Sequence, residues 1–335
     1  MNHLSLWRRL GILLLLAACA PHAVAAESRS ECISIRDPQA RLECFDRVSG
    51  TPPEVTGKPP AAPAARAVQA RASMIDEAWG FAPDAPEFLL RYYRPNYILP
   101  VSYSDEMNQE PFSPIFEATE PDLGLDDIEA RFQISFKSRL WSTEDRRWGA
   151  WIAYTQQSQW QVYSEDTSRP FRETNYMPEV FATYRPDVEF GGWRWGLLKF
   201  GYNHQSNGRS QLLSRSWDRL VVEAGLERDN LGLHLRAWYR IEEDRDEDDN
   251  PDITDYLGYS ELTGLYRHGG HSVTLMGRGN WRTGKGAAQL NYMSPPLLGA
   301  LRGYLRVFSG YGDSMIDYNW NQTVVGIGVS LNDGF

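Results

Sequence analysis

Long apolar segments, positive net charge and cysteine are all scarce in this sequence. The chain has 335 residues, a formal net charge of −10 and only three cysteines, and its mean hydropathy is −0.49. The acidic balance argues against a nucleic-acid partner. After residue 19 no apolar run approaches the ~18 residues that a membrane-spanning helix requires, so such helices are excluded. A membrane β-barrel is not excluded, because strands that alternate apolar and polar residues average to polar values.

Aromatic residues, in contrast, are abundant. They make up 13% of the chain, with 12 Trp and 17 Tyr. Barrels use aromatic residues for the girdles at both membrane interfaces. Aromatic-rich β-sandwiches contain them too, so composition alone leaves both architectures open.

Residues 1–26 have the features of a secretory signal. Arg8 and Arg9 form a positive segment that precedes an apolar core. Small residues around 23–26 favour ordinary signal-peptidase cleavage. The alternative is residues 16–19 (LAAC), which resemble a lipobox and would leave Cys19 lipidated.

The next segments predict a small tethered appendage. Residues 27–50 contain Cys32 and Cys44, and an exported protein meets an oxidising compartment, so we expect these two cysteines to pair. Residues 51–84 form a linker whose first part is rich in Pro and Ala. The remaining residues, 85–335, form the main domain.

The main domain has the period-two alternation of β-strands. We expect about twelve strands, connected alternately by short turns and longer loops, with one exception near 283–285. This asymmetry is typical of an outer-membrane barrel. The last expected strand ends at Phe335, in phase with its apolar residues. The predicted strands are 89–103, 127–141, 147–163, 176–186, 192–206, 215–226, 230–242, 255–267, 271–282, 286–295, 300–310 and 321–335.

One hairpin in this domain contains a candidate catalytic group. His204 and Ser206 are two residues apart, so an extended strand places them on the same face. A chain reversal brings Asp218 back beside them. Nucleophile, base and orienting carboxylate are the parts of a serine hydrolase. By parity they share a face with apolar residues, so in a barrel they lie on the lipid-facing wall.

Several motifs in the main domain resemble the outer membrane phospholipase A family. The resemblance covers roughly residues 85–335 and does not include the cysteine-containing segment. The matching motifs are residues 171–176 (FRETNY), 202–210 (YNHQSNGRS), 214–217 (SRSW), 249–254 (DNPDIT) and 309–312 (SGYG).

The resemblance implies an all-β, twelve-stranded antiparallel transmembrane barrel in the bacterial outer membrane. It further implies hydrolysis of the acyl esters of glycerophospholipids, with phospholipase A1, A2 and lysophospholipase activity at the outer leaflet. Dependence on Ca²⁺ and activation by homodimerisation are also implied.

Carried over by position, Ser206 matches the nucleophile and His204 the general base. Asp218 stands where well-known family members have Asn. A carboxylate orients the imidazole as an amide does and also stabilises the imidazolium, so we expect activity with altered pH or calcium dependence. Gly208 matches the backbone N–H donor of the oxyanion hole, and Gln156 a residue that orders the active-site water.

The family's calcium ligands match three positions: the Arg209 carbonyl, the Ser214 hydroxyl, and Ser168 of the partner subunit. Few of them are charged, so modest affinity is expected. Two alternatives to a membrane phospholipase remain. A non-enzymatic barrel, such as a porin, adhesin or lipid-asymmetry protein, is supported only by the Asp218 departure. A soluble β-sandwich esterase is disfavoured by the loop asymmetry and by Phe335.

Overall fold

The computed structural model describes residues 32–49, 73–119, 124–165, 169–244 and 246–334. The chain divides into two compact units, Met1–Gln69 and Ala70–Phe335. The predicted signal peptide, Cys19, Phe335 and most of the expected linker lie outside the described residues.

The first unit contains helix α2 (Pro38–Ser49) and a disulfide between Cys32 and Cys44. The Asp37 side chain caps the start of this helix by accepting hydrogen bonds from the N–H groups of Gln39 and Ala40. Pro38 occupies the first helical position, where its missing N–H costs nothing. The predicted cysteine pairing is confirmed.

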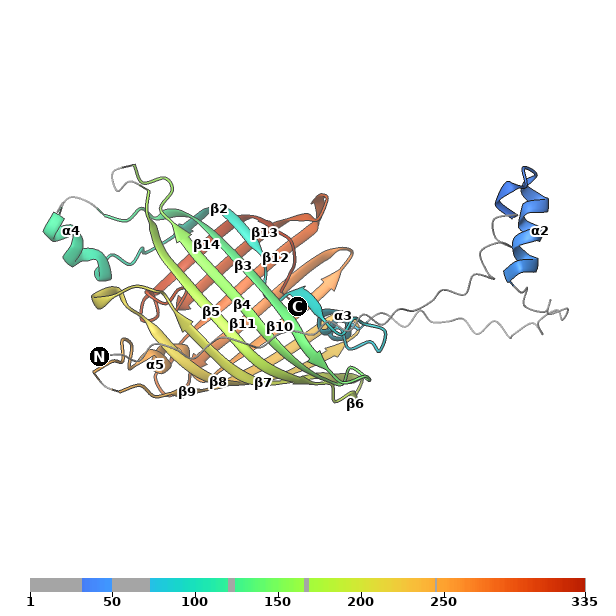
Figure 1. Ribbon diagram of the computed structural model, residues 1–335. Helices are drawn as coiled ribbons and strands as arrows, with labels where there is room; N and C mark the ends of the chain where they lie inside the picture. The colour runs from blue at the N-terminus through green and yellow to red at the C-terminus, as the bar shows by residue number, and fades with distance from the viewer. Residues whose placement is uncertain (1–31, 50–72, 120–123, 166–168, 245, 335) are drawn as a thin grey trace, which may run out of the picture. The chain divides into compact units, whose positions relative to one another are not determined.

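The second unit is a closed antiparallel β-barrel with twelve strand positions around its wall, as predicted (Figure 1). β1 and β2 both pair with β3 and together occupy the first of these positions. Pro95 lies in the break between them and lacks the N–H that a continuous ladder needs. The barrel closes where β2 pairs with β14. The strands are β1 (Leu89–Tyr92), β2 (Tyr97–Ser104), β3 (Ile128–Ser142), β4 (Trp148–Trp160), β5 (Phe171–Tyr184), β6 (Val188–Phe190), β7 (Trp193–Ser206), β8 (Ser216–Arg228), β9 (Leu231–Ile241), β10 (Ser260–His268), β11 (His271–Asn280), β12 (Lys285–Leu298), β13 (Leu301–Tyr311) and β14 (Asn321–Ser330).

The connections differ at the two ends of the barrel. Two-residue turns join β8 to β9 and β10 to β11 at one end, which we call the short-turn end. The opposite, long-loop end has the connection with η1 (Glu110–Phe112) and α4 (Ser113–Thr119), and those with η2 (Gln211–Leu213) and α5 (Ile253–Leu257). The expected exception also occurs, because residues 281–284 form a short turn at the long-loop end. Among the described residues, no helix is long and apolar enough to cross a membrane.

The wall is apolar outside and largely polar inside. On β3, Ile134 and Phe136 are 51% and 40% exposed, whereas the intervening Ser135 and the following Lys137 are buried. Successive strand residues point to opposite faces, so this inversion of the usual soluble pattern indicates a lipid-facing outer surface. β14 ends at Ser330, five residues before the predicted end.

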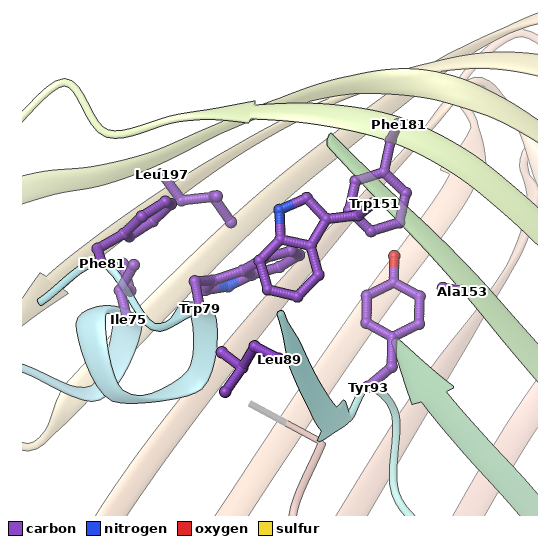
Figure 2. Packing of buried hydrophobic residues seen from close by; sticks show 9 residues of the cluster. All are labelled: Ile75, Trp79, Phe81, Leu89, Tyr93, Trp151, Ala153, Phe181 and Leu197. Atoms are coloured by element: carbon purple, nitrogen blue, oxygen red, sulfur yellow. The ribbon is translucent and has the colours of Figure 1, made fainter. Parts of the chain in front are cut away.

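A segment at the start of the second unit closes the short-turn end of the barrel. Helix α3 (Met74–Trp79) begins at Ser73, whose side chain accepts from the Asp76 N–H, and ends at Gly80 in the left-handed conformation. Ile75 and Trp79 pack against inward-facing residues of the wall (Figure 2). We call residues 73–88 the plug. The sequence predicted that residues 73–84 belong to the linker, but they belong to the second unit. They form part of an apolar cluster in the otherwise largely polar lumen, which consists of Ile75, Trp79, Phe81, Leu89, Tyr93, Trp151, Ala153, Phe181 and Leu197.

Ion pairs connect the plug and the long loops to the wall. The Asp76 carboxylate pairs with Arg185 and Arg194 at the short-turn end. At the other end, residues 312–320 bring Asp313 to Arg131 and Arg306. Asp313 and its two arginines are buried, and each has a close partner of opposite sign, as burial requires.

Candidate functional site

The hairpin formed by β7 and β8 positions the three candidate catalytic side chains. His204 lies directly opposite Asp218 in the antiparallel register. Both belong to the outward set, as shown by Phe200 and Val222, which are 56% and 44% exposed on the same strands. The predicted parity is therefore confirmed. All three candidates lie at the long-loop end, where β7 ends and β8 begins.

The Asp218 carboxylate holds the imidazole ring. His204 Nδ1 and Asp218 Oδ1 are 2.8 Å apart, and the Tyr202 hydroxyl donates to the same oxygen at 2.5 Å. The His204 and Asp218 side chains are 35% and 28% exposed. Because Nδ1 faces the carboxylate, Nε2 remains available to accept a proton.

Ser206 is the last residue of β7 and is displaced from the ring along the strand. In the described part of the chain no hydrogen bond joins it to His204, although the two residues share a face. Such bonds are often long before substrate binds. The next residue, Asn207, is buried and accepts from the Arg215 N–H, which fixes the loop between the strands.

Gly208 follows in a conformation that suits glycine. Its φ is +62°, and a Cβ there would lie 3.0 Å from the ring of Tyr176. Tyr176 is in turn the cross-strand partner of Ser206. A larger residue at position 208 would be strained and would crowd this ring. The glycine thus keeps the backbone close to the serine.

Gln156 lies on the same outer face but two strands away from Ser206. It pairs with Tyr176 across β4 and β5, and its side chain accepts a hydrogen bond of 3.1 Å from the Tyr154 hydroxyl. Tyr176 therefore stands between Gln156 and Ser206 in one row. The structure brings Gln156 near the site without direct contact with the hydroxyl.

Behind the catalytic hairpin, inside the barrel, Arg219 joins the two strands. It lies opposite Asn203 and donates hydrogen bonds to the side chains of Asn203 and Gln205. The indole N–H of Trp217 also donates to Gln205, at 3.1 Å, and the Arg219 guanidinium lies over the Trp217 ring. These contacts fix the inner side chains that alternate with His204 and Ser206.

Oxygen donors gather beside the hairpin. The Ser214 hydroxyl donates to the carboxylate of Asp249, which ends the acidic run of the β9–β10 loop. The guanidinium of Arg209 donates to the carbonyls of Phe171 and Arg172, which ties this residue to the start of β5. Ser168 lies outside the described residues. Hydroxyl, carboxylate and carbonyl oxygens are the ligands that a hard cation prefers.

Within the described ranges, no cluster of three or more His, Cys, Asp or Glu side chains is arranged to hold a metal ion. The calcium ligands expected from sequence in the described part of the chain are of another kind, a serine hydroxyl and a backbone carbonyl. Any cation here would retain several waters.

Comparisons with known proteins identify the family of this barrel. A family model described as phospholipase A1 matches residues 81–331. The chain belongs to the phospholipase A1 family. It is 41% identical over 251 residues to phospholipase A1 of Escherichia coli K12, which covers 74% of this chain and 83% of that protein. The Klebsiella pneumoniae phospholipase A1 is 40% identical, with 74% and 84% covered.

Solved structures in the phospholipase A1 family have the same fold. Outer membrane phospholipase A from E. coli matches with a TM-score of 0.69 and 37% identity, covering 78% of this chain and 98% of that one. The calcium-bound dimer of the Salmonella typhi outer membrane phospholipase matches with a TM-score of 0.70 and 38% identity, with the same coverage. Family and barrel together place the protein in the bacterial outer membrane, as an ester hydrolase of the phospholipase class.

Three residues at this site were not identified from sequence. Tyr202 and Arg219 belong to the two strands already predicted, and strand parity assigns their faces but not their contacts. Asp249 lies at the end of an acidic run, where sequence alone assigns it no partner. The sequence feature that pointed to Tyr202 and Asp249 was the pair of motifs at residues 202–210 and 249–254, because both segments match the family.

Proposed function

We propose that this protein hydrolyses the acyl esters of glycerophospholipids, including lysophospholipids, with Ser206, His204 and Asp218. The observation that supports this most strongly is the 2.8 Å contact between His204 and Asp218 on a wall that faces lipid. A hydrolytic group on that surface meets acyl chains without a solvent-filled binding pocket. Both relatives described above are named phospholipases, and that name describes the same chemistry.

In the proposed reaction, His204 Nε2 removes the proton of Ser206, whose oxygen attacks the ester carbonyl. Asp218 holds the ring and stabilises the imidazolium that forms. His204 then gives its proton to the departing lysolipid. Water, activated by the same ring, releases the fatty acid and restores the serine.

The developing oxyanion needs preorganised donors. We assign this role to the backbone N–H of Gly208, whose left-handed conformation keeps the chain close to Ser206. Gln156 is assigned to ordering a water beside it, on the basis of the family resemblance and its position in the same outer row.

The site is also proposed to bind Ca²⁺ through the Ser214 hydroxyl and the Arg209 carbonyl. The donor set fits the ion, because Ser214 already contacts a carboxylate oxygen of Asp249. Bound calcium would polarise a water that helps stabilise the oxyanion. Ser168 of the partner subunit completes the proposed ligand set in a homodimer, a state observed for the S. typhi relative.

The proposal is tested with the refolded barrel acting on phospholipid vesicles and on a chromogenic acyl ester. Ser206→Ala should lower kcat by about 10³-fold or more. Ser216→Ala is the matched control, because Ser216 lies directly opposite Ser206 and should leave kcat within about twofold. No turnover by the parent above that of protein-free vesicles would support the non-enzymatic barrel instead, and equal turnover in the parent and Ser206→Ala would contradict the role of Ser206.

Calcium and dimerisation have separate tests. Chelation should abolish turnover and added Ca²⁺ restore it, with Ser214→Ala requiring more calcium than the exposed-loop control Ser210→Ala. Crosslinked dimers should turn over faster than monomers. Equal rates with and without chelator, or in both oligomeric states, would contradict those parts of the proposal and leave the esterase intact.

A further inference from the structure

The lumen contains a chamber behind the catalytic hairpin. Its volume is about 250 Å³, far more than the ~10–15 Å³ that one water requires. Its wall contains more arginines than carboxylates. The arginines are Arg94, Arg219, Arg236, Arg278 and Arg306, and the carboxylates are Glu223, Glu261, Asp313 and Asp333.

Most of these carboxylates already have cationic partners. Asp313 pairs with Arg131 and Arg306, Asp333 with Arg267, and Glu223 with Lys199. Little negative charge therefore remains for the other cations of the chamber. Glu179, just beyond the lining, shows the same imbalance, because one carboxylate serves the cations Arg94, Lys199 and Arg236.

Arg219 and Arg278 have no carboxylate partner among the described residues. Their hydrogen bonds go to neutral acceptors: Arg219 to Asn203 and Gln205, and Arg278 to the carbonyls of Tyr311 and Gly312. Arg219 is only 7% exposed. Burying a cation without an anion is costly, so an unpaired guanidinium is a strong candidate to bind one.

Four guanidinium nitrogens of the lining also lack a hydrogen-bond partner within the described part of the chain. They are Nε of Arg219, Nε of Arg236, Nε of Arg278 and Nη1 of Arg306. Arg236 and Arg306 are at least nine-tenths buried, like Arg219. Guanidinium groups present planar N–H pairs that match oxyanions, which distinguishes a phosphate-type ligand from a simple halide.

We propose that this chamber is a binding site for a small oxyanion of the phosphate or sulfate class. Arg219 and Arg278 supply the uncompensated charge, and Arg236 and Arg306 supply additional donors. Glu261 is the cross-strand neighbour of Arg236 and Arg278. Its carboxylate limits the excess positive charge of the chamber, which favours a small anion over a polyanion.

A second cavity, of about 470 Å³, lies beside the plug and shares the lining residue Asp333 with the chamber. The Arg267 guanidinium holds Asp333 through two hydrogen bonds of 2.7 Å. The carboxylate that the two cavities share is therefore already paired with a cation.

Isothermal titration of the refolded full chain with inorganic phosphate tests the site, with chloride at equal ionic strength as the reference. Saturable binding of one phosphate is expected. Arg278→Gln should weaken it by about tenfold or more, and Arg219→Gln should do the same. Arg282→Gln is the matched control, because its side chain is 72% exposed and lies outside the chamber; binding should be unchanged.

Crystals of the parent grown with selenate give an independent readout through the anomalous signal of selenium. A peak between Arg219 and Arg278 is expected. Absence of that peak, or of saturable phosphate binding, would overturn the proposal and leave a chamber that holds only water. Equal weakening in Arg278→Gln and Arg282→Gln would also overturn it, as a general charge effect. If neither chamber variant refolds, the selenate map of the parent decides.

Discussion

Tyr202 donates a hydrogen bond of 2.5 Å to Asp218, from the position two residues before His204 on the same strand. The ring nitrogen of His204 contacts the same carboxylate oxygen. One carboxylate oxygen of Asp218 therefore contacts both side chains, and the tyrosine limits the positions that the carboxylate can adopt. This makes Tyr202 a positioning residue for the proposed reaction.

Removing the hydroxyl in Tyr202→Phe should lower kcat by about two- to tenfold, because a partly exposed hydrogen bond to a charged group is lost. KM should change little, since the ring still faces lipid. Steady-state kinetics on phospholipid vesicles measure both constants. Tyr239→Phe is the control, because Tyr239 is another outward tyrosine, 66% exposed. Equal losses in both variants would assign the effect to the lipid interface.

Asp218→Asn should keep measurable activity. An amide oxygen still orients the ring, but the imidazolium loses its neighbouring negative charge, so kcat should fall by about 10- to 100-fold. The pH–rate profile should differ from that of the parent, because the charge beside the ring has changed. A profile identical to that of the parent would show that the carboxylate adds nothing beyond orientation.

Acid should destabilise the barrel through Asp313. Burial alone raises the pKa of this carboxyl, but Arg131 and Arg306 outweigh burial and hold its pKa well below its usual range. A lowered folded-state pKa gives stability that is complete above the unfolded value of about 3.9 and is lost as pH falls below it. The urea concentration at the midpoint of unfolding should therefore fall as the pH is lowered below about 4.

Asp313→Asn should remove part of that acid dependence. It should also cost roughly 3–5 kcal/mol of unfolding free energy at pH 7, because Arg306 loses its buried carboxylate partner and Arg131 keeps only Glu129. Asp229→Asn removes an exposed turn carboxylate as the control, and Asn tolerates its positive φ of 53°. A parent-like acid slope in Asp313→Asn would refute the assignment.

Trp79→Ala tests the plug. Trp79 is 3% exposed, and the Lys137 ammonium lies 3.3 Å from the centre of its ring, so truncation leaves a cavity and an uncovered cation. A loss of about 3–5 kcal/mol in unfolding free energy is expected. Trp281→Ala, at a site 96% exposed, should stay within about 0.5 kcal/mol. Similar losses in the two variants would mean that the plug adds no stability.

Period-two alternation predicted the barrel and its site because burial in a membrane wall depends on parity alone. Ser206, His204 and Asp218 lie on the outer face for the same reason that Phe200 does. The plug could not be predicted in this way, since its short helix has no repeated pattern and its partners, such as Trp151, are distant in sequence. A buried aromatic on a strand does not reveal which segment covers it.

The contacts within the site were less predictable than its face. Alternation cannot show that Tyr202 reaches Asp218 or that Arg219 reaches Gln205, because both depend on the register between β7 and β8. Register is set by the hairpin connection, and here that connection is an irregular loop held by Asn207. The proposed calcium ligands likewise depend on how separate loops meet.

Closure of the ladder between β2 and β14 has a consequence for assembly. Ser104 and Gln322 hydrogen-bond although 218 positions separate them, so contact order at this seam is very high and formation should be slow. Until the two ends meet, each presents a bare strand edge whose amides find no partner in hydrocarbon. Truncation before β14 should thus yield aggregates rather than a smaller pore, because an incomplete set of strands cannot form a closed barrel within the bilayer.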